Sequence, residues 1–323
     1  MKINIKKTIA IVGALFALFT PTQILATTNW TGNISNDWHE SGNWSNGAPV
    51  YGNDPYITLG IVDMTSTVDI STTLTLQNAI LNIKNAYFRN STTLLFGGSD
   101  VTTSIFLDNA QAHTPLEVHN GHLGLDNNST FTATILTISD SSISIDNSSK
   151  LNTSYVYASE NLSVIISRNS EFLNTSKTDN WIFSGTLSLA AGGTFMGTDS
   201  NLTFDNNVSI LFDLTNLSEY NETKISAQTI TLKDNVTLII SNFSEESPFA
   251  SGDSFDLFDG TIVGTFASIQ LNKLTEGLFW DLTDLYITGT IRVGGTVIPE
   301  PSTYALIFGI LALALAIYRK RFF

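Results

Sequence analysis

The sequence predicts an all-β fold, and specifically a β-solenoid in which successive coils stack on one another. Apolar and polar residues alternate with a period of two through most of the chain, and helical periodicity is missing. Turns rich in Asn, Asp, Ser and Gly separate these segments, because such residues tolerate a left-handed backbone and bond their own backbone. An Asn-Ser turn before an apolar strand also recurs, near residues 128, 147 and 169.

The recurring turn sets the expected length of one coil. The apolar residues that follow it are Phe131, Leu151 and Phe172, which are separated by 20 and 21 residues. A period of about 20 residues is typical of one solenoid coil, which buries its apolar face only when neighbouring coils stack on it. Asn-rich turns can form ladders along such a stack. The alternative fold for the same short strands is a β-sandwich, or a pair of them.

Composition supports a folded and exported body. The chain has 323 residues, 42% of them hydrophobic, and it has no cysteine. This apolar content is too high for a disordered chain. The missing cysteines exclude disulfides and thiolate metal sites. We therefore expect packing and backbone hydrogen bonds to hold the fold together.

The charge distribution excludes one class of partner. Six of the 15 basic residues lie at the two ends, which leaves 9 basic residues in 27–298. The same stretch holds 28 of the 29 acidic residues, all except Glu300, so its net charge is −19. Binding to nucleic acid requires Lys and Arg to replace the counterions of the phosphates. We therefore expect no nucleic-acid partner.

Residues 1–26 have the pattern of a signal peptide. Basic residues at positions 2, 6 and 7 precede the apolar run Ile9–Phe19, and Ala26 ends a plausible cleavage site. Ile24 is larger than the residue usually found three positions before a cut. The alternative is a permanent N-terminal anchor, although the run is short for a bilayer that needs about 20 apolar residues.

The body falls into three predicted parts. Residues 27–55 hold three of the five tryptophans, Trp30, Trp38 and Trp44. We interpret them as a cap over the open end of the solenoid, and the alternative is a platform on which sugar rings stack. Residues 56–207 form the repetitive solenoid, and residues 208–295 form a more regular closing β segment.

Residues 296–323 form a three-part tail. The triplet Pro299, Glu300 and Pro301 is stiff and extended, because proline cannot join a helix interior or a central strand. The apolar stretch 304–318 then predicts a short transmembrane helix, about 22 Å long at 1.5 Å per residue. The basic cluster is expected to stay on the cytoplasmic side, with the body outside. Its residues are Arg319, Lys320 and Arg321.

This order of triplet, apolar helix and basic cluster resembles the PEP-CTERM sorting signal. The resemblance covers about the last 25 residues, and the sequence from Pro299 to Leu306 is similar to that of many members of the class. It implies recognition by an exosortase, a membrane-embedded cysteine protease of Gram-negative bacteria that make extracellular polysaccharide. The inner membrane would hold the chain before processing. The alternative is a plain C-terminal anchor whose prolines are linker residues.

The two borders of the body carry a further resemblance. The tryptophan-rich opening around Trp30, Trp38 and Trp44 is similar to the start of autotransporter-like passenger domains and of other PEP-CTERM proteins. The closing stretch from Gly252 to Gly289 is similar to the end of the same passengers. The resemblance implies a β-solenoid architecture, and it implies no chemistry.

The histidines are the first candidates for a metal site. The chain has four, at positions 39, 113, 119 and 122, and Glu117 lies close to two of them. On a strand, a spacing of three puts His119 and His122 on opposite faces unless a turn intervenes. Neither a zincin helix motif nor a calcium-binding repeat is present. We therefore interpret the histidines as polar surface residues and expect no cofactor.

The acidic residues predict no catalytic pair. Enzymes built on a β-helix need paired carboxylates, or acidic calcium ligands with a basic residue that acts on the sugar. Asp253, Asp256 and Asp259 lie in one strand-like stretch, where alternation divides them between two faces. Arg89 and Arg168 lie outside any dense acidic cluster.

The expected function is therefore that of an exported, non-enzymatic protein of the cell surface or extracellular matrix, in contact with exopolysaccharide. The alternatives are a secreted carbohydrate-active enzyme and a sugar-binding module on the same scaffold.

Overall fold

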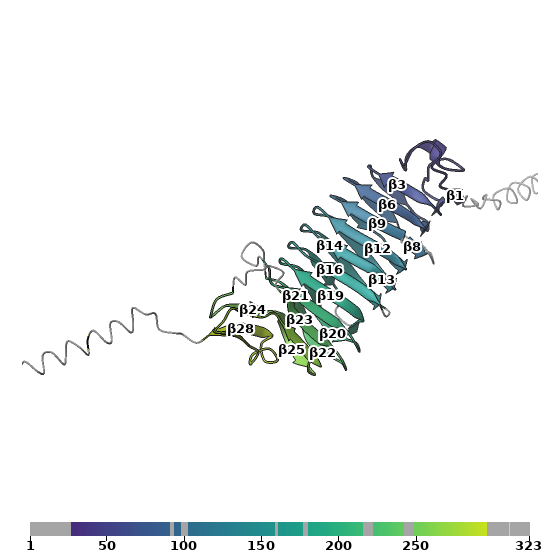
Figure 1. Cartoon of the computed structure of the whole chain (residues 1–323). Coiled ribbons are helices and arrows are strands. Elements are labelled where there is room, and N and C mark those ends of the chain that lie inside the picture. The colour runs from purple at the N-terminus through teal and green to yellow at the C-terminus, as the bar shows by residue number, and fades with distance from the viewer. Residues whose placement is uncertain are drawn as a thin grey trace, which may run out of the picture.

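Alternation of apolar and polar side chains explains where the strands form. In the strand Ser142–Ile145 both isoleucines are buried and both serines are half-buried. The computed structural model describes residues 27–90, 94–97, 103–158, 161–176, 180–215, 222–241, 249–295 and Ile310. Stacked coils form an elongated body with the N-terminal strands at one end and the C-terminal strands at the other (Figure 1).

One strand of each coil joins a parallel sheet that has ten strands in the described part of the chain. These strands are β3 (Gly60–Met64), β6 (Ala79–Lys84), β9 (Thr103–Asp108), β12 (Gly121–Asp126), β14 (Ser142–Ile145), β16 (Leu162–Ile166), β19 (Gly185–Ala190), β21 (Ser209–Asp213), β23 (Thr237–Ser241) and β26 (Ser268–Leu271).

A second parallel sheet, with fifteen described strands, supplies the other two faces of each coil. Its long strands bend across both faces: the first half of β13 pairs with β10 and the second half with β11. The strands are β1 (Thr27–Asn29), β2 (Asp54–Ile57), β4 (Val68–Ile70), β5 (Thr75–Gln77), β7 (Tyr87–Asn90), β8 (Leu94–Gly97), β10 (Gln111–His113), β11 (Leu116–His119), β13 (Thr130–Ser139), β15 (Lys150–Ala158), β17 (Glu171–Asn174), β18 (Asn180–Phe183), β20 (Thr194–Phe204), β22 (Lys224–Leu232) and β25 (Phe258–Val263).

The core lies inside the coils as columns of in-register apolar side chains. Full burial of each such side chain contributes about 1.5–3 kcal/mol, so the stability of the stack is distributed along its length. In one column of the ten-stranded sheet every side chain from β3 to β23 is at most 1% exposed, and these are Val62, Leu81, Ile105, Leu123, Ile143, Val164, Leu187, Ile210 and Leu238.

The structure confirms the predicted fold class. The chain is all-β, and its parallel coils form a β-solenoid rather than a β-sandwich. The predicted period is also confirmed, because Phe131 pairs with Leu151 and Leu151 pairs with Phe172 in successive coils. Each of these three side chains is at most 1% exposed.

The tryptophan-rich segment covers the N-terminal edges of both sheets. Strand β1 pairs with β2 and so begins the fifteen-stranded sheet. The chain then crosses to the ten-stranded sheet, where Trp38 N–H donates to the Asp63 carbonyl oxygen at 3.0 Å. A short 3-10 helix, η1 (Ser41–Asn43), leads back toward the first sheet. Strand edges that would otherwise lie open are thereby paired.

The parallel stack continues past residue 207, where the sequence predicted the end of the repetitive solenoid. Strands β21, β23 and β26 pair in the same parallel way as the strands before them. The positive-φ turns that precede strands of this sheet continue as well: Asn161 in an earlier coil has a φ of 66°, and Asn207 and Asn235 have φ angles of 64° and 61°.

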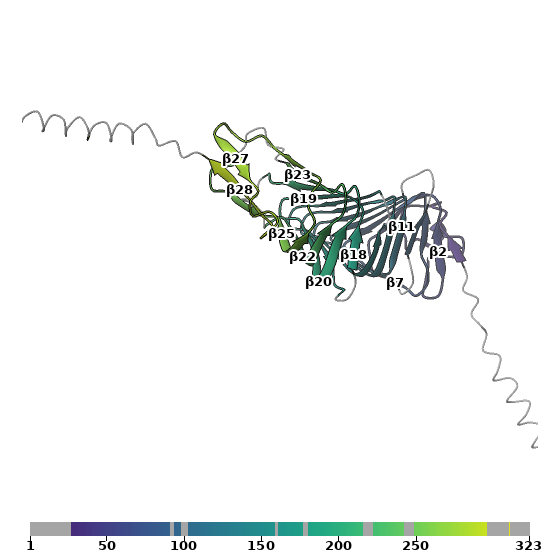
Figure 2. The ribbon, with the colours of Figure 1, turned by 90° about the horizontal axis from the view of Figure 1, so that it is seen from below.

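The antiparallel part of the closing segment is a separate three-stranded sheet (Figure 2). Its strands are β24 (Ser254–Asp256), β28 (Thr290–Gly295) and β27 (Leu278–Asp281).

The predicted signal peptide, residues 1–26, lies outside the described residues. So do the triplet Pro299, Glu300 and Pro301 and the basic cluster at 319–321. Of the predicted transmembrane stretch 304–318 only Ile310 is described, and its backbone is helical. Within the described part of the chain, no helix has the length and apolar character needed to cross a bilayer.

Candidate functional site

The three tryptophans are packed inside the N-terminal cap. Trp30, Trp38 and Trp44 are 8%, 1% and 4% exposed. Trp44 meets each of the other two edge to face, with ring centroids 5.0 and 4.9 Å apart. Its indole Nε1–H donates to the Trp38 carbonyl oxygen at 2.7 Å. The sugar-stacking interpretation of these residues is therefore wrong, because no ring presents a free face, whereas their burial at the stack end fits the cap.

The histidines considered for a metal site are separated by the fold. His119 lies on β11, where its Nε2 is 2.6 Å from the Glu117 carboxylate. His122 lies on β12 in the other sheet, where its Nδ1 is 2.8 Å from Ser142 Oγ. The turn between the two strands therefore sends the imidazoles to different faces. Among the described residues, no group of three or more His, Cys, Asp or Glu side chains could hold a metal ion.

The acidic and basic residues considered for catalysis lie apart as well. Arg89 pairs with Asp69 and Arg168 with Asp146, each on a neighbouring coil. Asp253 accepts the Ala250 N–H at 2.7 Å, which ties it into a turn.

Asp256 and Asp259 lie on different strands, β24 and β25. Partial burial raises the pKa of Asp256, and the neighbouring Glu222 and Asp259 raise it further against the opposing effect of Lys224.

A groove crosses the outer face of the ten-stranded sheet. We define it by its floor, which is one outward row of in-register residues: Phe106, Gly124, Ser144 and Ile165. Its volume is about 440 Å³. The bulky ends of the row, Phe106 and Ile165, are 39% and 49% exposed. They are three strand spacings apart, or about 14 Å, and only small residues lie between them.

Gly124 leaves room for the exposed aromatic ring. A Cβ at this position would lie 2.6 Å from Cδ1 of Phe106, so the ring rests over the glycine. The ring also meets the His122 imidazole, with centroids 5.3 Å apart. Burial lowers the pKa of His122, which favours the neutral imidazole. The imidazole next to the ring therefore adds no charge to the floor, and the charges of the groove lie at its border.

The groove ends on one side in an aspartate row, formed by Asp108, Asp126 and Asp146 at the corner that follows the ten-stranded sheet. Asp108 and Asp126 are paired in register. Neighbouring positions in such a row are about 4.8 Å apart. At one end Lys84 lies 3.5 Å from Asp108, and at the other Arg168 lies 2.6 Å from Asp146.

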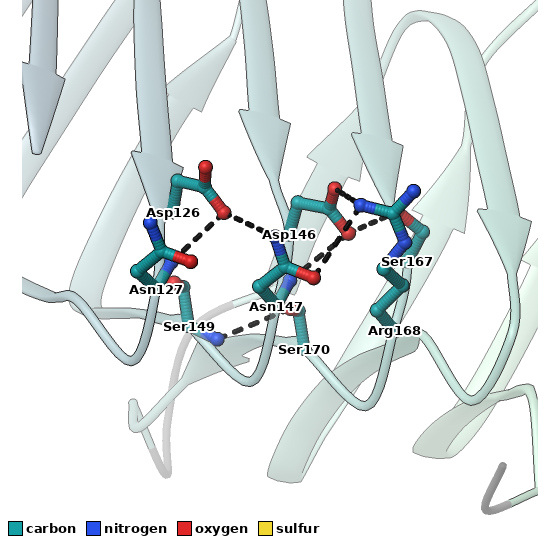
Figure 3. A network of polar contacts seen from close by, with 8 residues as sticks. All are labelled: Asp126, Asn127, Asp146, Asn147, Ser149, Ser167, Arg168 and Ser170. Carbon is teal, nitrogen blue, oxygen red and sulfur yellow. Dashed lines mark hydrogen bonds and ion pairs between the residues drawn. The ribbon is translucent and has the colours of Figure 1, made fainter. Parts of the chain in front are cut away.

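Hydrogen bonds between coils hold the row in place (Figure 3). The side-chain amide of Asn127 donates to Asp108 at 2.8 Å, and that of Asn147 donates to Asp126 at 2.6 Å. Both asparagines have positive φ, 53° and 51°, a conformation that Asn adopts at low cost. Asp126 accepts both of its hydrogen bonds at Oδ1, so Oδ2 is the oxygen left for a ligand.

A second row of hydrogen bonds lies beneath the first. Ser129, Ser149 and Ser170 are at most 1% exposed. The backbone N–H of each coil donates to the serine Oγ of the next coil, at 3.1 Å for both Ser129 to Ser149 and Ser149 to Ser170. These bonds satisfy backbone groups that would otherwise be buried without a partner.

This arrangement suits binding better than bond breaking. An aromatic ring and an aliphatic side chain can pack against the C–H face of a sugar, while carboxylate and serine oxygens accept its hydroxyl protons. Sequence reasoning did not single out Phe106, because Ile105-Phe106-Leu107 reads as an unbroken apolar run. Only the pairing shows that the phenylalanine points outward.

Comparisons with models of known protein families, with curated protein sequences and with solved structures found no match for this chain.

Proposed function

We propose that this chain is an exported, non-enzymatic protein of the cell surface or extracellular matrix, and that its groove binds exopolysaccharide. The single observation that carries this proposal is the exposed Phe106 ring over Gly124, bordered by the aspartate row. A solenoid supports such a role because a long, flat, rigid face can contact several units of an extended polymer.

Export and sorting rest on the two ends of the sequence. Residues 1–26 would direct export, and the tail with Pro299, Glu300 and Pro301 would be recognised by an exosortase-type protease of a Gram-negative bacterium. The helix at 304–318 would hold the chain in the inner membrane before processing. The body would then stand at the cell surface or be released from it.

Binding to a panel of polysaccharides tests the groove. With the full-length chain in detergent, Phe106→Ala should weaken binding about tenfold or more, since one lost stacking contact of about 1.4 kcal/mol corresponds to that factor. Gly124→Val should weaken it similarly, because its side chain fills the space under the ring. Leu211→Ala is the matched control, since Leu211 lies in the same row two strands beyond Ile165.

The outcomes separate the candidate functions. Equal loss in the Leu211→Ala variant, or no loss in the Phe106→Ala variant, would remove the groove from the proposal. Shortening of a polysaccharide during incubation with the protein would contradict the non-enzymatic function and favour the carbohydrate-active enzyme.

Sorting is tested independently of the groove. Cell fractionation and C-terminal mass mapping would compare the native chain with one whose Pro299, Glu300 and Pro301 are replaced by alanine. We expect the native chain to lose its tail near the triplet and the variant to keep it. The same mass and location in both would mean that the tail is only an anchor.

A further inference from the structure

A second ladder of side chains lies at the corner that precedes the ten-stranded sheet, across that sheet from the aspartate row. The side-chain amide of Asn161 donates to Asp140 Oδ1 at 2.8 Å, and that of Asn235 donates to Asn207 Oδ1 at 3.3 Å. In each bond the Nδ2 of one coil meets the Oδ1 of the preceding coil. The direction of the ladder is therefore the same on both sides of the coil that contains Gly185.

In that coil the ladder position is held by Ser184, because Gly185 pairs with Leu162. The short, buried side chain of Ser184 carries no amide group to continue the ladder. Phe183 pairs with Phe204 and Thr186 pairs with Ser209, so the corner at 184–185 is two residues shorter than the next corner, 205–208. Gly185 has a φ of +113°, and a Cβ there would lie 2.0 Å from the Leu162 carbonyl oxygen. The close approach of the coils therefore excludes any side chain at this position.

A notch of about 510 Å³ lies at this short corner, between Asn161 of the preceding coil and Asn207 of the next. One wall carries Asn161, whose Nδ2 is engaged with Asp140, so Oδ1 remains as an acceptor. The other wall carries Asn207, whose Oδ1 is engaged with Asn235, so Nδ2 remains as a donor. Ser163, Ser184 and Thr186 add hydroxyl groups to the lining.

The walls define what fits between them. The walls are two strand spacings apart, about 10 Å, so the layer between them is one spacing, about 5 Å, thick. A saturated six-membered ring has about this thickness. A hydroxyl group can donate to Asn161 Oδ1 and another can accept from Asn207 Nδ2. A carboxylate or phosphate oxygen offers acceptors only, and an ammonium group offers donors only.

Charge at the notch points to a neutral occupant. Asp205 lines the notch, and its carboxylate is held by the Asn206 N–H at 2.9 Å and by Lys233 at 3.2 Å. The Asn206 hydrogen bond, together with Lys233, lowers the pKa of Asp205 and so favours the carboxylate. An anionic ligand would be repelled by this carboxylate, and Lys233 is already paired with it.

We propose that the notch binds one neutral pyranose residue, which lies at Ser184 between Asn161 and Asn207, where the ladder lacks an amide group. The residue can be a free sugar or one unit of a polysaccharide. This site is separate from the groove, because the notch lies at the beginning of β16, β19 and β21 and the aspartate row follows β9, β12 and β14.

Calorimetric titration of the full-length chain with neutral methyl hexopyranosides, and with neutral polysaccharide fragments, tests the proposal. We expect saturable binding to at least one of the two ligand forms, and comparing them shows whether the residue is free or part of a polymer. Asn207→Asp should weaken binding tenfold or more, because it replaces the donor by a carboxylate of the same shape. Asp also tolerates the positive φ at this position.

Asn120→Asp is the matched control, since Asn120 occupies the same corner on an earlier coil with a φ of 51°. It should change the affinity less than twofold. Thr186→Val removes a notch hydroxyl at nearly constant shape and should also weaken binding. It serves as a second probe in case the Asn207→Asp variant does not fold.

The proposal is overturned if neither ligand form binds, if inorganic phosphate binds as tightly as the neutral sugars, or if the Asn120→Asp variant loses as much affinity as the notch variants. Phe106→Ala should leave methyl hexopyranoside binding unchanged, so failure of the groove and failure of the notch are distinguishable.

Discussion

Two stretches of the corners that flank the ten-stranded sheet differ in whether successive coils have the same length. At the corner after the sheet, the pairing of Leu125, Ile145 and Ile166 and of Thr130, Lys150 and Glu171 leaves four residues in each of three coils. That corner carries an unbroken network (Figure 3). At the corner before the sheet, one coil is two residues shorter than the next, and a notch lies where the ladder lacks an amide group.

The difference teaches how a repetitive fold acquires a local site. Stacking keeps the strands in register whatever the corner does, so a shorter corner changes the surface without breaking the core. Uniform corners give hydrogen bonds between coils, and an unequal corner leaves the same groups available to a ligand.

The largest effect is expected at the interrupted corner itself. Gly185→Ala would place a methyl group 2.0 Å from the Leu162 carbonyl oxygen at a φ of +113°. We expect a loss of about 3 kcal/mol or more in the free energy of unfolding, from a backbone clash added to conformational strain. Denaturant unfolding of the purified chain measures it.

Gly252→Ala is its control. Gly252 has a similar φ, +101°, but nothing lies within 4 Å of the added atom. Only the strain of about 1–3 kcal/mol remains there. Equal losses in both variants would show that the coils near Gly185 can separate.

The buried row of the uniform corner should give the next largest effect. Ser149→Ala leaves the Ser129 backbone N–H without its acceptor in a fully buried place. Such a loss costs about 1–3 kcal/mol. Ser188→Ala, on the outer face of β19, should stay within about 0.5 kcal/mol. Amide hydrogen exchange at Ser129 would show whether the loss is local, and unchanged protection there would contradict the role of the row.

Between the two corners, His122 should make stability depend on pH. Burial lowers its pKa in the folded chain below the ordinary 6.5. The unfolded chain then binds more protons below pH 6.5, so this contribution to stability is present above pH 6.5 and is lost as the pH falls through the folded pKa.

The His122→Ser variant should lack this loss of stability, because serine has no proton to exchange in this pH range. Serine suits the position, since it occupies both neighbouring positions of the row, at 104 and 142. The midpoint of thermal unfolding between pH 7.5 and 5 measures the effect. A native chain whose midpoint follows the same curve as the variant would contradict it.

The smallest effect should come from the exposed ion pairs of the two corners. Arg168 pairs with Asp146 at 2.6 Å, and Lys233 pairs with Asp205 at 3.2 Å. Exposed pairs contribute about 0–1 kcal/mol and are screened by salt. Arg168→Asn, which suits the φ of 49°, and Lys233→Met should each change stability by less than about 1 kcal/mol. A larger change that persists at high salt would mean that the corner depends on the pair itself.

Much of the scaffold was predictable because its causes are local. Alternation predicted the strands, and the Asn-Ser turns with the spacing of Phe131, Leu151 and Phe172 predicted the coil length, which the register confirms. The boundary expected at residue 207 does not interrupt the parallel stack. Asn207 and Asn235 continue the positive-φ turns of the corner before the ten-stranded sheet, which Asn120 and Asn161 form in earlier coils.

The candidate site was less predictable, because its residues meet only across coils. Phe106 lies between two buried apolar residues in the chain, so nothing local shows that it faces outward. Gly124 becomes its neighbour through the pairing of β9 with β12, and Ile165 joins the same row through β14 and β16. The choice between the tryptophan cap and its alternative, the sugar platform, also depended on contacts across the fold, since Trp38 is buried where its segment meets β3.

Side-chain periodicity and turn chemistry act between neighbours in the chain, and they alone are enough to make this protein an all-β stack of coils about 20 residues long. Register between coils acts over one whole coil, and it depends on how the core columns fit together. That register places an aromatic ring over Gly124, aligns the aspartate row, and opens the notch at Gly185. The groove and the notch therefore come from the stacking of coils, because the residues that line each of them belong to several coils and no short segment of the sequence contains them all.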